Sequence, residues 1–168
     1  VAAVAATAID ASGATTASVT YNGRPVATRI PRPPMLYFAS PGGLVAVRGD
    51  HRTVREALEA YRSSALPSSA RRLPGDVQVR GVSIDEDAGI VTLRFSFPES
   101  LHTLAVESPS LARTVLLGLI ATVTEVPGIR AAQLDFDGRA RLGLGQCSDL
   151  LRTPQARPRV LNDERVLD

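Results

Sequence analysis

Residues 108–138 read SPSLARTVLLGLIATVTEVPGIRAAQLDFDG and carry the strongest structural signals in the chain. The Ser-Pro pair near the start of this stretch is typical of a helix N-terminus, because proline fits the first helical position. Apolar residues then cover most of the helix circumference as far as Val123, which predicts a buried core helix. The sequence Val-Pro-Gly ends that helix, and Ile129–Phe136 is predicted to be a strand.

A capping box predicts a shorter helix upstream. Thr53 and Glu56 have the spacing that lets each side chain accept a hydrogen bond from an otherwise unpaired backbone N–H group. Apolar side chains recur at i, i+3, i+4 and i+7 from Val54 to Tyr61, so they share one helix face. Pro67 limits how far this helix can continue.

Strand patterns lie on both sides of this shorter helix. Met35–Ala39 and Leu44–Arg48 are predicted to pair as a β-hairpin across a Pro-Gly-Gly turn. Residues 77–84 and 91–97 alternate apolar and polar positions, which is typical of strands with one buried face, and Gly81 is a predicted bulge. The elements together predict an α+β fold of two layers, with two helices on one face of a mixed or antiparallel sheet of about four to six strands.

The two ends of the chain differ from the middle. Residues 1–34 are predicted to be a linker that contains a short hairpin, because Asn22-Gly23 is a strong signal for a type I′ turn. The first eight residues are small and apolar, which is typical of the end of a removed signal peptide or membrane anchor. Residues 35–142 are the predicted packed domain, and residues 143–168 are predicted to be a C-terminal tail.

Composition and charge argue against several classes of function. The net charge is +2, and one Arg-Arg pair with few aromatic residues makes no nucleic-acid patch. Cys147 is the single cysteine, so neither an internal disulfide nor a cysteine-based zinc site can form. We interpret Cys147 as a small residue in a loosely structured tail. We expect no nucleic-acid partner and no cofactor.

The polar residues form no established catalytic motif. His51 and His102 lack metal-ligand spacing and are predicted to be solvated loop residues. No Gly-x-Ser-x-Gly sequence is present, and the acidic run Asp85-Glu86-Asp87 is interpreted as a solvated turn. Asp135 and Asp137 fall on one strand face, where they could act as a carboxylate pair of the glycosidase type. We therefore predict no catalytic, cofactor-binding or metal-binding residues, with this pair as the alternative.

The segment Leu36–Gly138 resembles a GerMN domain, the sporulation and spore germination family. Residues 121–129 read Ala-Thr-Val-Thr-Glu-Val-Pro-Gly-Ile, similar to the family's thread Thr-Leu-Thr-Glu-Phe-Pro-Gly-Val, and the last strand and its Asp-Gly turn follow at the right distance. Leu36-Tyr37-Phe38 resembles the family's opening strand. The sequence departs from the family at Val126, where the family has phenylalanine.

The resemblance implies a small α+β domain whose fold is similar to ring-building motifs. It also implies an exported or membrane-anchored protein tied to sporulation, germination and envelope assembly. The expected role is a non-enzymatic, extracytoplasmic interaction module, with the membrane reached only through a removed N-terminal segment. Its expected partners are envelope proteins or further copies of itself.

The sequence offers one candidate interaction surface and one alternative function. The surface is predicted, from expected exposure, at Tyr37, Arg113, Leu117, Ala121 and Arg139. The alternative is a peptidoglycan- or glycan-binding domain, or a weak wall hydrolase that uses Asp135 and Asp137. The low aromatic content of 4% argues against glycan binding, because sugars usually stack on aromatic rings.

Overall fold

The computed structural model describes residues 16–31, 33–96, 99–137 and 144–158. The chain divides into two compact units, residues 1–34 and residues 35–168. Each unit is described by itself.

The described part of the first unit is a β-hairpin. Strands β1 (Thr16–Tyr21) and β2 (Arg24–Pro31) pair antiparallel. Asn22 and Gly23 join them with φ angles of 51° and 74°. Two positive φ angles are what a type I′ turn requires, so the hairpin predicted from the Asn-Gly pair is present.

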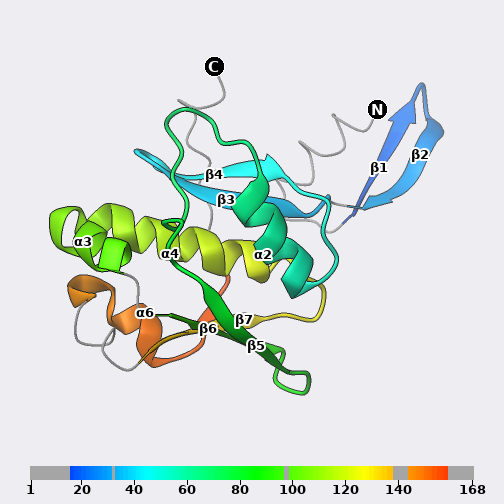
Figure 1. Cartoon of the computed structure of the whole chain (residues 1–168). Coiled ribbons are helices and arrows are strands. Elements are labelled where there is room, and N and C mark those ends of the chain that lie inside the picture. Colours follow the sequence, from blue (N-terminus) through cyan, green and yellow to red (C-terminus); the bar gives the residue numbers. More distant parts are fainter. Residues whose placement is uncertain (1–15, 32, 97–98, 138–143, 159–168) are drawn as a thin grey trace. The chain divides into compact units, whose positions relative to one another are not determined.

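The second unit contains the α+β domain (Figure 1). Along the chain its elements are β3 (Met35–Ser40), β4 (Gly43–Arg48), α2 (Val54–Ser63), β5 (Val79–Asp85), β6 (Ile90–Phe95), α3 (Glu99–Glu107), α4 (Pro109–Val123), β7 (Ala131–Phe136), the 3-10 turn η1 (Gly145–Cys147), α6 (Asp149–Arg152) and β8 (Gln155–Ala156).

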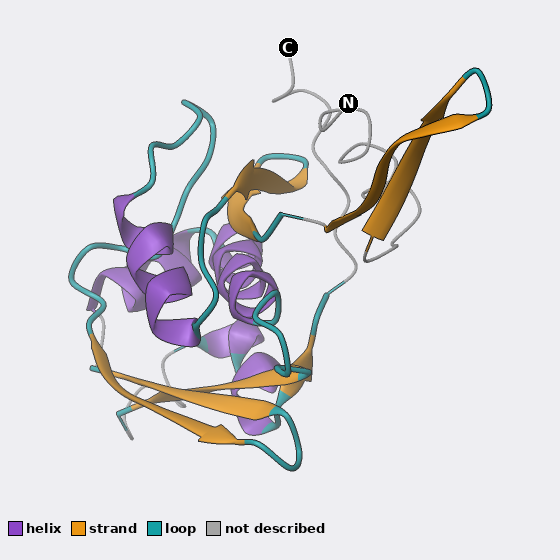
Figure 2. Cartoon of the chain, turned by 90° about the vertical axis from the view of Figure 1, so that its right-hand side faces the viewer, coloured by secondary structure: helices purple, strands orange, loops and turns teal. Residues whose placement is uncertain are grey.

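Two sheets enclose the long helix. Strands β5, β6, β7 and β8 form a four-stranded mixed sheet in that order, with β6 and β7 parallel and the other pairs antiparallel. Strands β3 and β4 form a separate two-stranded sheet. Helix α4 lies between the β3–β4 hairpin and the four-stranded sheet (Figures 1 and 2). The predicted α+β class with a mixed sheet is confirmed, and the hairpin adds strands on the far side of α4.

Helix α4 is the centre of the core because its sequence is apolar on nearly every side. Its 15 residues include nine that are buried. Gly118 lets the backbone of β3 come close, since a Cβ atom at this position would lie 2.7 Å from the carbonyl oxygen of Tyr37. The Thr122 hydroxyl accepts a hydrogen bond from the Tyr37 backbone N–H at 2.9 Å and donates to the Gly118 carbonyl at 2.9 Å. These contacts fix the hairpin on the helix.

The inner face of the four-stranded sheet supplies the other half of the core. Phe95 of β6 and Phe136 of β7 stack with their ring centroids 4.9 Å apart. Val91 and Leu93 are fully buried on β6, as the alternation of that strand predicts. Among the described helices, none combines the length and hydrophobicity that a membrane span needs.

Two parts of the chain differ from the sequence-based expectation. Residues 99–107 form helix α3, so His102 lies on a helix and its prediction as a loop residue is wrong. The predicted loose tail is also wrong over residues 144–156, where β8 pairs with β7 and the buried side chains include Leu144, Cys147, Leu150 and Leu151. Burial of these apolar side chains holds the segment on the domain.

Candidate functional site

A groove lies between helix α2 and strand β5. The capping box of Thr53 and Glu56 starts α2 as predicted. The helix buries one face in the core and leaves its arginines outside. The groove has a volume of about 690 Å³. We call it the α2–β5 groove; it is lined by Arg55, Leu58, Glu59, Arg62, Ser63, Val79, Arg80, Gly81 and Val82.

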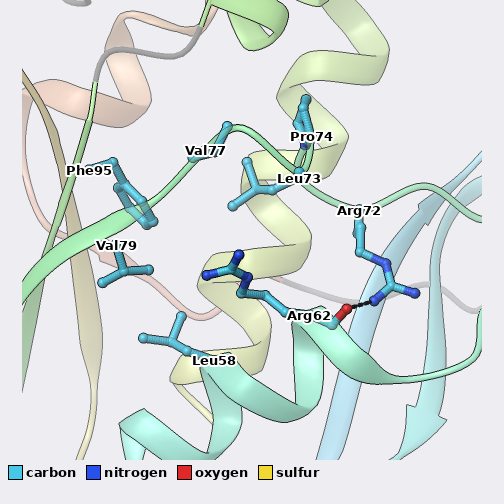
Figure 3. A pocket seen from close by; sticks show the side chains of 9 residues that line it. Leu58, Arg62, Arg72, Leu73, Pro74, Val77, Val79 and Phe95 are labelled. Carbon is cyan, nitrogen blue, oxygen red and sulfur yellow. Dashed lines mark hydrogen bonds between the residues drawn. The ribbon is translucent and has the colours of Figure 1, made fainter.

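A smaller pocket of about 150 Å³ shares Leu58, Arg62 and Val79 with this groove. Figure 3 shows the side chain of Arg62 pointing into this pocket, toward the apolar residues around Phe95. Arg72, on another wall, donates hydrogen bonds to the carbonyl oxygens of Tyr61, at 3.1 Å, and of Arg62 (dashed in Figure 3). Arg72 therefore caps the C-terminal end of α2, where the backbone carbonyls lack helical partners.

The groove is cationic and partly apolar. Three arginines line it against one glutamate, Glu59. Arg55, Arg62 and Arg80 are exposed, and none of the three forms an ion pair with another described residue. Such a surface suits an extended acidic and apolar chain, because its aliphatic side chains can bury apolar groups while its arginines attract carboxylates.

A polar cluster at the end of α4 contacts the C-terminal segment. The Tyr37 hydroxyl donates to Glu125 Oε1 at 2.5 Å, and Arg157 Nη2 donates to the Tyr37 hydroxyl at 2.6 Å. Arg157 also forms an ion pair with Glu125 and lies over the Tyr37 ring. The Glu125 side chain is only 6% exposed. The cluster joins β3, the end of α4 and the C-terminal segment, so its contacts are internal to the domain.

The structure does not bring the predicted interaction residues together on a surface. Tyr37 and Ala121 are buried, 1% and 0% exposed, because they pack together where the β3–β4 hairpin meets α4. Their prediction as surface residues is therefore wrong. Leu117 is half-buried against the same cluster. Arg113 is bound to Asp149 at 2.8 Å, and Arg139 lies outside the described residues.

The predicted carboxylate pair lies at the end of β7. Asp135 is on the outer face of the sheet, 4.0 Å from Arg94, with its side chain 42% exposed. Asp137 follows the strand and is exposed. Within the described ranges, no group of three or more His, Cys, Asp or Glu side chains is placed to hold a metal ion.

His51 is buried, so its prediction as a solvated residue is wrong. It is 3% exposed, and neither ring nitrogen has a hydrogen-bond partner in the described structure. Burial lowers the pKa of His51 below its usual value, although nearby carboxylates, Glu125 first among them, act in the opposite direction. Burial therefore favours the neutral form of the imidazole in the folded protein.

We expect acid to destabilise the protein through His51. Because the folded-state pKa is lowered, the unfolded chain binds a proton first as the pH falls below about 6.5. The free energy of unfolding should then fall by up to about 1.4 kcal/mol per pH unit until the folded-state pKa is reached. Urea denaturation of wild type and His51→Gln between about pH 7.5 and about pH 5 measures this loss. A variant with the same pH dependence as wild type would contradict it, and His102→Gln is the matched control.

The groove was not predicted from the sequence. No sequence motif marks Arg55, Glu59 and Arg62 as a binding site, and the alternation over residues 77–84 predicts only a strand with one buried face. The signal that identifies the groove is the position of β5 at the edge of the sheet. The alternation of a strand does not reveal whether the strand lies at the edge of a sheet, because its pairing partners are set by the whole fold.

Comparison with known proteins gives a family and a similar solved structure. The Germane family model, described as sporulation and spore germination, matches residues 35–141, more than half of the 168 residues. The solved tandem GerMN domains of the sporulation protein GerM from Bacillus subtilis are similar, with a TM-score of 0.51 and 17% identity. The match covers 85% of this chain and 58% of that chain, so this chain spans less than two thirds of its length. At this identity the likeness concerns the fold alone. No curated protein matches the chain.

Proposed function

The chain belongs to the Germane family of sporulation and spore germination domains, and on that premise we propose that it is a non-enzymatic, extracytoplasmic interaction module of cell-envelope assembly. The family match confirms the resemblance drawn from residues 121–129. The observation that carries the proposal is the α2–β5 groove, a cationic and partly apolar surface beside the edge of a sheet.

Three features of the groove support protein binding. Its lining includes aliphatic side chains and three arginines, and β5 beside it has a single neighbour among the described strands. An edge strand presents backbone groups to which an extended segment can add. The partner of this module is then an envelope protein or another copy of the chain. The extracytoplasmic location follows the family resemblance.

In-cell photocrosslinking tests this proposal. A photoreactive amino acid replaces Ser63, which is exposed and lines the groove, and a matched variant carries it at Ser69, which is exposed but does not line it. We expect one or two recurrent envelope proteins, or the chain itself, to crosslink from Ser63 and not from Ser69. The adducts are identified by mass spectrometry.

Two results would overturn the proposal. Equal crosslinking from Ser63 and Ser69 would mean that the groove has no specific partner. Retention on purified peptidoglycan that is lost on replacing Asp135 and Asp137 by asparagine, without any protein adduct from Ser63, would favour the wall-binding function instead.

A further inference from the structure

Strand β5 carries apolar side chains beyond the area that the helices cover. Val82 is paired with Leu93, and Ile84 with Val91. Directly opposite residues of an antiparallel pair lie on the same face, so both belong to the core-facing side of the sheet. Leu93 and Val91 are fully buried, yet Val82 is 38% exposed and Ile84 is 47% exposed. The inner face of the sheet therefore continues, uncovered, to its β5 edge.

The two ends of this edge have opposite charge. Near its beginning, β5 forms one wall of the α2–β5 groove, with Arg55, Arg62 and Arg80. At its end, the turn into β6 contains Asp85-Glu86-Asp87, all exposed. This turn extends away from the body of the sheet in Figure 1. The β5 edge is thus cationic at one end, aliphatic in the middle and anionic at the other. When two copies of this edge run antiparallel, the cationic end of each meets the anionic end of the other.

We propose that a second copy of this chain docks on β5, with the two β5 strands antiparallel about a twofold axis at Ser83. This inference rests on the proposed function, for which it names one partner and one surface. In this register Val82 lies opposite Ile84 of the second copy. Arg80 is the extra residue of a bulge between Val79 and Gly81, at the end of the paired segment, where it lies near the acidic turn of the second copy that contains Glu86. Each acidic turn then reaches the α2–β5 groove of the other copy.

The register satisfies three requirements together. The apolar residues of both copies stay on the inner face, because a pairing centred on a residue preserves the alternation of the strand. The arginines at the beginning of each β5 face the acidic turn of the other copy, and such opposite charges favour association. The contact uses the same surface on both copies, so the assembly closes as a dimer. At the other edge of the sheet, β8 is only two residues long and offers little backbone for further addition.

Cysteine crosslinking tests the register. In a Cys147→Ala background, Ser83→Cys places a thiol opposite its own counterpart across the twofold axis, where directly opposed Cβ atoms are about 4.5–5.5 Å apart. We expect a disulfide-linked dimer on mild oxidation, read on a non-reducing gel. Asp85→Cys, on the same strand, and Thr92→Cys, opposite Ser83 on β6, are the matched controls and should crosslink at least about tenfold more slowly. Equal rates for Ser83→Cys and Asp85→Cys would overturn the register.

Charge reversal tests the interface by sedimentation equilibrium. Arg80→Glu should raise the dimer dissociation constant roughly tenfold, because two symmetry-related attractions become repulsions. Combining it with Glu86→Arg should restore wild-type association. Circular dichroism confirms that each variant is folded. A wild-type chain that is monomeric at all concentrations, or a double variant that remains as weak as Arg80→Glu alone, would overturn the proposal.

These outcomes separate the dimer from the proposed function. A monomeric chain that still crosslinks from Ser63 to an envelope protein overturns the β5 dimer and leaves the proposed function standing. A chain that dimerises through Ser83 but crosslinks from Ser63 only to itself supports the dimer, and removes the envelope protein as a partner of the groove.

Discussion

Replacement of Leu119 by alanine is expected to lower the free energy of unfolding by about 2–5 kcal/mol. Leu119 is fully buried on α4. The helix has the β3–β4 hairpin on one side and the four-stranded sheet on the other (Figures 1 and 2). Neighbours held on both sides cannot collapse easily into the space that a missing side chain leaves, so the loss should include a cavity term. Urea denaturation followed by circular dichroism measures it.

Leu117→Ala is the matched control, on the same helix with the same chemical change. Leu117 is half-buried and packs at the boundary of the two apolar clusters. Its truncation removes less buried surface, so it should cost less than about half as much. Equal losses for the two variants would contradict the central position of α4, and would indicate that Leu117 is covered as completely as Leu119.

The sequence predicted those elements whose signals are local. The capping box at Thr53 and Glu56 forms as expected, because its two hydrogen bonds involve residues three apart. Asn22-Gly23 makes its turn for the same reason. The core position of α4 was also predictable, because an apolar surface on every side of a helix leaves no face suited to water.

Features that depend on distant parts of the chain were not predictable. Tyr37 and Ala121 are buried together because β3 packs on α4, a contact across more than 80 positions of the sequence. Cys147 is buried because the C-terminal segment returns to the domain. The edge position of β5 likewise follows from strand order. In each case the local pattern is compatible with several environments, and tertiary packing selects one.

The residues that suggested the family perform a structural role in this chain. Thr122 ties the backbone of β3 to α4, and Glu125 binds both the Tyr37 hydroxyl and Arg157. Gly128 has a φ of +87°, which favours glycine. A motif of this kind marks how the domain is held together, so its presence identifies the fold without identifying what the domain binds.

Glu125→Ala is therefore expected to destabilise the domain, by about 1–3 kcal/mol, rather than to act on binding alone. The change removes the acceptor of the buried Tyr37 hydroxyl, whereas Arg157, 33% exposed, can turn to water. Tyr37→Phe removes the donor instead, and the double variant should cost less than the sum of the two single changes, because each removes the same hydrogen bond. Urea denaturation of the four proteins of this cycle measures the coupling. Strictly additive losses would show that the Tyr37–Glu125 contact does not stabilise the fold. If Glu125→Ala left the stability unchanged but abolished crosslinking from Ser63, Glu125 would be part of the binding surface.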